Sequence, residues 1–467
     1  MQRIIAPLIF LLASIAVAQT SQPTVKLAVT TQPLGQSNKL SAKFKLAVSR
    51  DNKRLGLFLF DGQQVAVILD GKPLATHEWV VPNSGDFTED SKTLVYIAQQ
   101  GPEMAVCVNG KPLKGYYEVL PPVAASVDGS HLAYVAREKT GKRLVVFDGV
   151  ESARFDEISS LVLSQDAKRI AYIGRRDGVT FLVDGTTETR VDSKPFDPAI
   201  ARFGAEGKRL AFMYEVGSKV YLRVDGQPFG PYEGVRGNPV IAYDGTHWAI
   251  AAKLDGKWSA TEDGKPIATA DDIAMMGYLE NPIRLRYVTL NDKVQRMVID
   301  GKVVATLPEG VGFLPISPHS PDYQRLAYPS RHSTDEQFIV VDGKEQATFK
   351  RVVPPIFSKD SKHVGYIASK TGNDVQIVVD GVIIAALDNA AVSIDSLIFS
   401  PDGKHVAWLA MPAGQKPGLY VDNVRGPSLP EMPKGSRITF DDDATLRILA
   451  SDNDYNVFTY VVKIQPN

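Results

Sequence analysis

The stretch LIFSPDGKHVAWLAMPAGQKPGLYVDN, residues 397–423, contains the pattern that decides the fold. Three short, largely apolar runs at 397–399, 405–411 and 418–421 are separated by turn residues. In the first turn, PDGK at 401–404, Pro fixes φ, Asp bonds its own backbone and Gly accepts a positive φ. Short apolar runs bounded in this way predict β-strands, and the stretch shows no sustained helical period.

The third run ends in Asp422-Asn423, and Asp-Gly or Asn-Gly pairs hold this position in the rest of the chain. Such a pair is the strongest short hairpin signal, because a type I′ turn needs a positive φ at both central residues. We therefore predict two-residue hairpins with both residues at φ > 0. The ten pairs, about 39 residues apart on average, are Asp70-Gly71, Asn109-Gly110, Asp148-Gly149, Asp184-Gly185, Asp225-Gly226, Asp263-Gly264, Asp300-Gly301, Asp342-Gly343, Asp380-Gly381 and Asp422-Asn423.

A weaker fourth run follows each hairpin pair, as at 72–76 and 111–115. Pro occurs in both runs and cannot donate to a strand ladder, which suits an exposed outer edge. Four antiparallel strands repeated about every forty residues are typical of β-propeller blades. The sequence thus predicts an all-β propeller of about ten to eleven four-stranded repeats.

The turn before the second strand recurs eleven times, more or less faithfully, whereas only ten hairpin pairs occur. The last repeat therefore lacks its fourth strand, and one extra β-prone run, Thr24 to Thr31, precedes the first full repeat. We expect this run to pair with Val457 to Val462. Such pairing would close the ring and remove its open edges.

Single propeller rings typically have four to eight blades, and about eleven repeats exceed that number. We therefore expect two rings, residues 24–237 and 238–467, divided near Gly237. The alternative is a single propeller over residues 24–467, because no Pro/Gly/Ser-rich linker interrupts the repeats.

The N-terminus has the pattern of a secretory signal peptide over residues 1–18, with a basic start, a short apolar stretch and Ala16-Val17-Ala18 before Gln19. The apolar stretch is short for a membrane span. We expect a periplasmic or extracellular bacterial protein, monomeric, with no membrane span after cleavage. The single Cys107 predicts no internal disulfide. Because 52 Lys and Arg balance 53 Asp and Glu, we expect no nucleic-acid partner.

The segment Ser400-Pro401-Asp402-Gly403-Lys404, with weaker copies such as residues 358–362, resembles the TolB-type, WD-like β-propeller repeat of bacterial exported proteins. The resemblance covers nearly the whole mature chain and implies an exported propeller. The TolB family has an α/β domain before its propeller, whereas repeats begin here almost directly after the signal. A role in the Tol system is therefore not implied.

Four histidines share one slot of the repeat with arginines such as Arg54, Arg169 and Arg209. This alternation predicts a basic position beside a turn, with a structural or solvated role, and no metal site. The acidic groups at 441–443 and 452–454 lack the Gly and distal Glu of an EF-hand loop. We expect neither a metal nor a cofactor. The four histidines are His131, His247, His363 and His405.

A second recurrence follows the fourth strand, where an acid comes between an aromatic or apolar residue and Val or Ile. The candidate binding residues are Glu118, Asp156, Glu233 and Glu309. Since they hold equivalent positions, we expect them on one face around a channel mouth, with pKa values raised by mutual repulsion. A cationic ligand or basic partner surface would suit such a ring. The alternative is that each acid caps local backbone N–H groups.

The leading function is an exported, non-catalytic scaffold that presents a face to a protein, peptide or glycan partner. The alternative is a propeller enzyme, a polysaccharide lyase or hydrolase whose residues converge from different blades on a channel mouth. Such a site needs no local motif, so enzymatic activity stays open. A purely structural envelope or matrix role is the third possibility.

Overall fold

The computed structural model describes residues 25–36, 46–60, 62–191, 194–195, 202–204, 207–280, 282–307, 319–392, 396–429, 437–451 and 456–466. These residues form 46 strands and no α-helix, which confirms the all-β prediction. In the same residues no helix has the length and apolar character needed to cross a membrane. The predicted signal peptide, residues 1–18, lies outside the described residues.

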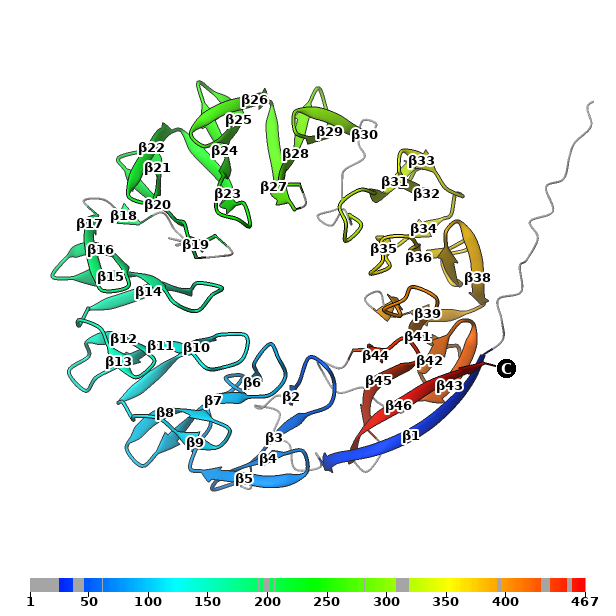
Figure 1. Ribbon diagram of the computed structural model, residues 1–467, viewed down its shortest axis with the longest axis horizontal. Coiled ribbons are helices and arrows are strands. Elements are labelled where there is room, and N and C mark those ends of the chain that lie inside the picture. The colour runs from blue at the N-terminus through cyan, green and yellow to red at the C-terminus, as the bar shows by residue number, and fades with distance from the viewer. Residues whose placement is uncertain are drawn as a thin grey trace, which may run out of the picture.

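The strands form eleven antiparallel sheets, here called blades 1 to 11, arranged around a central opening (Figure 1). In a typical blade the first strand lies nearest the opening and the last strand lies at the rim. Blades 1 to 4 are β2 (Ala47–Val48), β3 (Leu55–Phe60), β4 (Val65–Leu69), β5 (Lys72–His77); β6 (Asp86–Phe87), β7 (Leu94–Gln100), β8 (Glu103–Val108), β9 (Lys111–Pro112); β10 (Glu118–Ala125), β11 (Leu132–Arg137), β12 (Arg143–Phe147), β13 (Val150–Glu151); and β14 (Glu157–Leu163), β15 (Ile170–Arg176), β16 (Val179–Asp184), β17 (Thr187–Val191).

In blades 5, 9 and 10 the innermost position is divided between two short strands. Blades 5 to 8 are β18 (Lys194–Pro195), β19 (Arg202–Phe203), β20 (Leu210–Val216), β21 (Lys219–Val224), β22 (Gln227–Tyr232); β23 (Gly234–Ile241), β24 (Trp248–Leu254), β25 (Lys257–Glu262), β26 (Lys265–Ala270); β27 (Asp272–Leu279), β28 (Arg284–Asn291), β29 (Val294–Ile299), β30 (Lys302–Leu307); and β31 (Ala327–Ser333), β32 (Glu336–Val341), β33 (Lys344–Glu345). Blades 9 to 11 are β34 (Arg351–Val352), β35 (Ile356–Phe357), β36 (Val364–Ser369), β37 (Val375–Val379), β38 (Val382–Leu387); β39 (Ala390–Val392), β40 (Ile398–Phe399), β41 (Val406–Pro412), β42 (Gly418–Val421), β43 (Val424–Ser428); and β44 (Thr439–Asp442), β45 (Thr445–Ser451), β46 (Asn456–Pro466) with β1 (Val25–Gln36).

The blades form one ring, because each hydrophobic core lies between two neighbouring blades. Eleven such cores follow one another around the described chain, and the last joins blade 11 to blade 1 through Leu449 and Leu57. The expected division near Gly237 is not present. Gly237 lies inside β23, whose blade packs on both blade 5 and blade 7. Since both faces of each blade are apolar, no blade offers a polar face at which a smaller ring could end.

The N-terminal strand β1 completes blade 11. It pairs antiparallel with β46, with Val29 opposite Val462 and Thr30 opposite Val461. The predicted pairing of Thr24 to Thr31 with Val457 to Val462 is confirmed over the described residues, and the paired region is longer than predicted. The two ends of the chain therefore seal the ring as neighbouring strands.

Nine of the ten hairpin pairs have a positive φ at both residues, as predicted; Asp380 and Gly381, for example, have φ values of 50° and 80°. The exception is in blade 4, where Asp184 pairs with Thr187 as the last residue of its strand. The turn there is Gly185-Thr186, with a positive φ at Gly185. Glycine at the first central position is the requirement of a type II′ turn.

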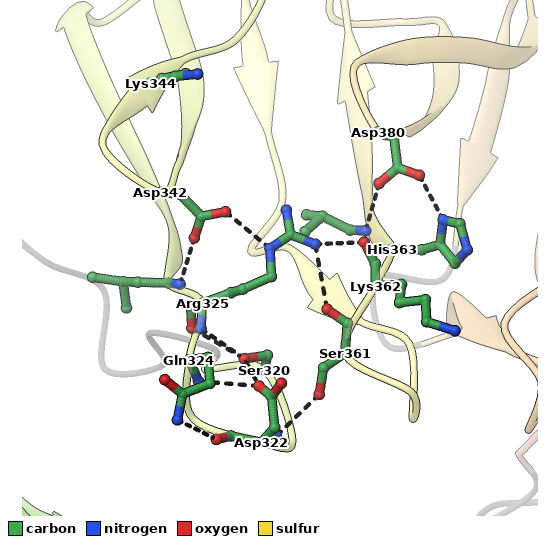
Figure 2. Close-up of polar contacts among 12 residues, drawn as sticks. Ser320, Asp322, Gln324, Arg325, Asp342, Lys344, Ser361, Lys362, His363 and Asp380 are labelled. Carbon is green, nitrogen blue, oxygen red and sulfur yellow. Dashed lines mark hydrogen bonds and ion pairs between the residues drawn. The ribbon is translucent and has the colours of Figure 1, made fainter.

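In nine blades the first residue of the hairpin pair also binds the backbone at the start of the second strand. In blade 8, Asp342 Oδ1 accepts a hydrogen bond from the Leu326 backbone N–H at 2.9 Å, and Oδ2 accepts one from Arg325 Nε at 2.9 Å (Figure 2). In blade 9, Asp380 accepts equivalent bonds from the Val364 N–H and from His363 Nδ1. The shared His/Arg slot therefore has a structural role.

At several positions the arginine of this slot also reaches the next blade. Arg325 Nη1 donates to the carbonyl oxygens of Ser361 and Lys362 in blade 9 (Figure 2). Arg169 and Arg284 donate in the same way to carbonyls of the following blades. The arginines thus fasten neighbouring turns together, whereas Nδ1 of each of the four histidines bonds the hairpin aspartate of its own blade.

Replacing Gly381 by Val is expected to destabilise the fold, because a β-branched residue would be forced to a φ near 80°. The expected cost is roughly 1–3 kcal/mol in the free energy of unfolding, measured by urea denaturation. Gly381→Asn is the matched control, because Asn tolerates this region and Asn423 already occupies it at a φ of 69°. A Val variant as stable as the Asn variant would contradict the hairpin assignment.

Deleting the mature N-terminus through Thr31 is expected to lower the Tm and increase aggregation, because β46 would then present an open edge. The control is a deletion that stops at Thr24, before β1 begins. Thermal unfolding followed by circular dichroism, with light scattering, measures both effects. An unchanged Tm for the longer deletion would show that the ring does not depend on this strand.

Candidate functional site

The ring has two faces that carry different connections between strands, because neighbouring strands in each blade are antiparallel. The linker face carries the hairpins between second and third strands and the links from each outermost strand to the next innermost strand. The turn face carries the turns between first and second strands and the Asp-Gly hairpins. The repeated hydrogen bonds from the strand N–H groups to the hairpin aspartates lie on the turn face.

The predicted acids lie at one end of the innermost strands. Glu118 is the first residue of β10, and Asp156 and Glu233 immediately precede β14 and β23. These three strands lie toward the central opening (Figure 1). The three acids therefore share the linker face, while the fourth candidate, Glu309, lies outside the described residues.

Each of these three carboxylates has partners nearby. Glu118 accepts a hydrogen bond from Arg137 Nε at 2.6 Å. Asp156 accepts one from Lys142 Nζ at 2.6 Å and one from the Asp177 backbone N–H at 2.9 Å. Glu233 accepts one from the Gly256 N–H at 3.0 Å.

The Lys142 and Asp177 bonds connect the hairpins of two neighbouring blades through Asp156. The hydrogen bond from Lys142 lowers the pKa of Asp156, which is opposite to the rise expected from repulsion between acids. Pairing with a cation outweighs repulsion here, because the lysine ammonium is in direct contact and the other acids are not. A ligand-binding role for the acids stays a prediction.

Blade 9 departs from this pattern, because Lys350-Arg351 stand where other blades have the acid. Arg351 begins β34 and its side chain is exposed. The Arg351 guanidinium makes no hydrogen bond or ion pair with any residue of the described chain. Lys350 lies 4.0 Å from Asp335, a distance at the limit of an ion pair. The linker face therefore carries an uncompensated cation at this blade.

A cavity of about 510 Å³ lies between blades 9 and 10 beside Arg351. Ile367 and Val375 of blade 9 supply apolar wall, and Asn373 and Asn389 supply exposed amides. Ligand pockets in proteins commonly enclose about 300–1,000 Å³ and combine apolar walls with a few polar groups. The size and lining of this cavity match that description.

The acid in the cavity wall, Asp374, is occupied by its own loop. Its carboxylate accepts hydrogen bonds from Ser369 Oγ at 2.7 Å, from the Thr371 N–H and Oγ1 at 2.7 Å each, and from Gln376 Nε2 at 3.0 Å. Burial alone would raise the pKa of Asp374, but these hydrogen bonds outweigh it and lower the pKa. Asp374 is therefore ionised, and its carboxylate oxygens hold the loop through the hydrogen bonds that they accept.

This arrangement favours an anionic group as occupant. Arg351 offers a planar guanidinium suited to a carboxylate, whereas Asp374 has little capacity left to receive a ligand cation. Sequence reasoning did not identify this cavity. The sequence does contain one indication of this site, because Lys350-Arg351 replace the acid that recurs at this position in other blades. The cavity itself could not be predicted, since it forms only where blades 9 and 10 pack together.

The described residues contain no group of three His, Cys, Asp or Glu side chains that could hold a metal ion. Cys107 is buried, and burial raises the pKa of its thiol to about 12. Burial and the neighbouring Arg286, 3.1 Å away, lower the pKa of His319 to about 4.

No family model matches the chain, and no curated protein matches it. Similar solved structures include a eukaryotic initiation factor (13% identity, 67% of this chain and 89% of that chain, TM-score 0.38) and KlHsv2 with its loop 6CD replaced by a Gly-Ser linker (14%, 57% and 96%, 0.26). The Dos1 propeller is also similar (12%, 64% and 90%, 0.31). The propeller fold of this chain is shown by its own eleven described sheets.

Asp156→Asn is expected to lower the Tm at pH 7, because it removes the carboxylate that connects Lys142 to the Asp177 N–H. Since the folded-state pKa lies below 3.8, this stabilisation is present above pH 3.8 and is lost as the pH falls through the folded value. Calorimetry from pH 7 down to pH 3 measures the difference. The control is Glu157→Gln, an exposed neighbour whose contact to Arg175 is 3.9 Å. A pH-independent difference would contradict this role.

Proposed function

We propose that this protein is an exported, non-catalytic β-propeller scaffold that binds an anionic group of a peptide or protein partner on its linker face. The unpaired Arg351 in the cavity between blades 9 and 10 carries the proposal. The apolar wall formed by Ile367 and Val375 would receive an aliphatic part of the same partner. A carboxylate on a short apolar body is the chemistry of an acidic or C-terminal peptide segment.

The described walls of the cavity favour binding over catalysis. Hydrolysis of a glycosidic bond ordinarily needs two carboxylates, one of which acts as a proton donor. The cavity wall has Asp374, which is saturated with hydrogen bonds and ionised, and the residues that line the cavity include no histidine. The polysaccharide enzyme therefore remains the second candidate, with no residues of this cavity assigned to it.

Export is supported by two features of the chain. Residues 1–18 have the pattern of a signal peptide, and the repeats resemble those of TolB-type exported proteins. Cleavage after Ala18 would leave β1 intact, because this strand begins at Val25. The mature chain would then keep all the residues that close the ring, in the periplasm or outside the cell.

Arg351→Ala is expected to weaken binding of acidic peptides at least tenfold, about 1.4 kcal/mol. The probes are an array of peptides with free C-terminal carboxylates and the same peptides in amidated form, followed by titration calorimetry of those that bind. Arg351→Lys keeps the charge without the planar fork and should lose less affinity. The control is Lys139→Ala, an exposed cation on the linker face at blade 3. The absence of any binding peptide, or equal affinity of wild type and Arg351→Ala, would overturn the proposal.

A further inference from the structure

A second pocket, of about 290 Å³, opens on the turn face and involves three successive blades. Phe203 ends β19 of blade 5, Val240 and Ile241 end β23 of blade 6, and Tyr278 lies at the end of β27 of blade 7. All three are innermost strands, near the central opening (Figure 1). The pocket therefore lies at the inner edge of the turn face, opposite the face that carries the Arg351 cavity.

Three aromatic rings line this pocket, and they differ in how firmly they are held. The Tyr278 hydroxyl donates to Glu262 at 2.8 Å, and the Arg169 guanidinium lies 4.9 Å from the centre of the Phe203 ring. Tyr243, in the turn after β23, is 46% exposed. Its hydroxyl makes no hydrogen bond to any described residue. Tyr243 thus presents an exposed aromatic surface in this pocket, whereas the other two rings are held by polar partners.

The polar group of the pocket is Glu280, which follows β27. It is partly buried, and it makes no hydrogen bond or ion pair with any residue that the structure describes. A carboxylate of this kind is an acceptor that lacks a donor. The pocket therefore combines an exposed aromatic ring with an unsatisfied acceptor.

We infer that this pocket binds an uncharged saccharide unit. An anion would be repelled by Glu280. A cation would seek the aromatic faces, but the Arg169 guanidinium already covers the Phe203 ring. A sugar ring brings hydroxyl donors for Glu280 and an apolar C–H face for Tyr243.

The volume limits the size of the occupant. At about 290 Å³ the pocket lies just below the usual range of roughly 300–1,000 Å³ for ligand sites. One or two sugar units of a longer glycan are therefore the expected occupant. Because the pocket opens on the turn face, the rest of a glycan chain could continue over that face.

The test titrates the full mature protein with neutral oligosaccharides of glucose, galactose and N-acetylglucosamine, using saturation-transfer NMR and calorimetry. Tyr243→Ala is expected to lower the affinity at least tenfold, Tyr243→Phe to retain it and Glu280→Gln to lower it several-fold. The matched control is Tyr117→Ala, which removes an equally exposed aromatic ring (48%) on the linker face. Thermal unfolding confirms that each variant is folded.

Three results would overturn the inference: no saturation transfer from any of these sugars, equal affinity of wild type and Tyr243→Ala, or binding of tetramethylammonium in place of sugars. The last result would identify the pocket as a cation site. Arg351→Ala should leave sugar binding unchanged. Failure at this pocket and failure of the peptide-binding proposal are therefore distinguishable.

Discussion

The hydrogen bond between the first residue of a hairpin pair and the backbone N–H at the start of the second strand is the interaction on which the ring depends. It recurs in nine blades, with Asn109 in place of aspartate in blade 2. The same carboxylate often holds the His or Arg beside it, so one side chain fixes the strand, the turn and the basic group. This lock keeps the turn face regular, whereas the linker face can vary between blades.

Compensated charge is the second common feature of the blades. Arginines of the shared slot contact carbonyls of the next blade, and acids at the starts of innermost strands contact lysines, arginines and hairpin N–H groups. In such a molecule a charged side chain without an ion-pair or hydrogen-bond partner is an exception to the common pattern. Arg351 on the linker face and Glu280 on the turn face are two such groups, and each stands beside a pocket.

The sequence predicted those parts of the fold that depend on local chemistry. The Asp-Gly pairs predict hairpins because these residues favour a positive φ. The extra β-prone run Thr24 to Thr31 predicted the closing strand, because the open edge of the last blade needs a partner. The number of rings could not be predicted, since the angle between blades is set by contacts such as Leu57 with Leu449. For the acids, the sequence indicated equivalent positions, but their pKa values depend on neighbours such as Lys142 that only the packed ring brings close. Both pockets depend on packing between blades in the same way.

The pairing of β1 with β46 also imposes an order on folding. Strand β1 precedes the other described strands along the chain, and its ladder partner β46 follows them. A ring of this kind cannot be sealed while the chain is still emerging, since blade 11 lacks one strand until Asn456–Pro466 is available. The free strand must stay soluble during that interval, and Lys26, Thr30 and Thr31, which are exposed in the finished blade, provide polar groups along it. Closure of the ring therefore has to follow synthesis of all eleven described blades.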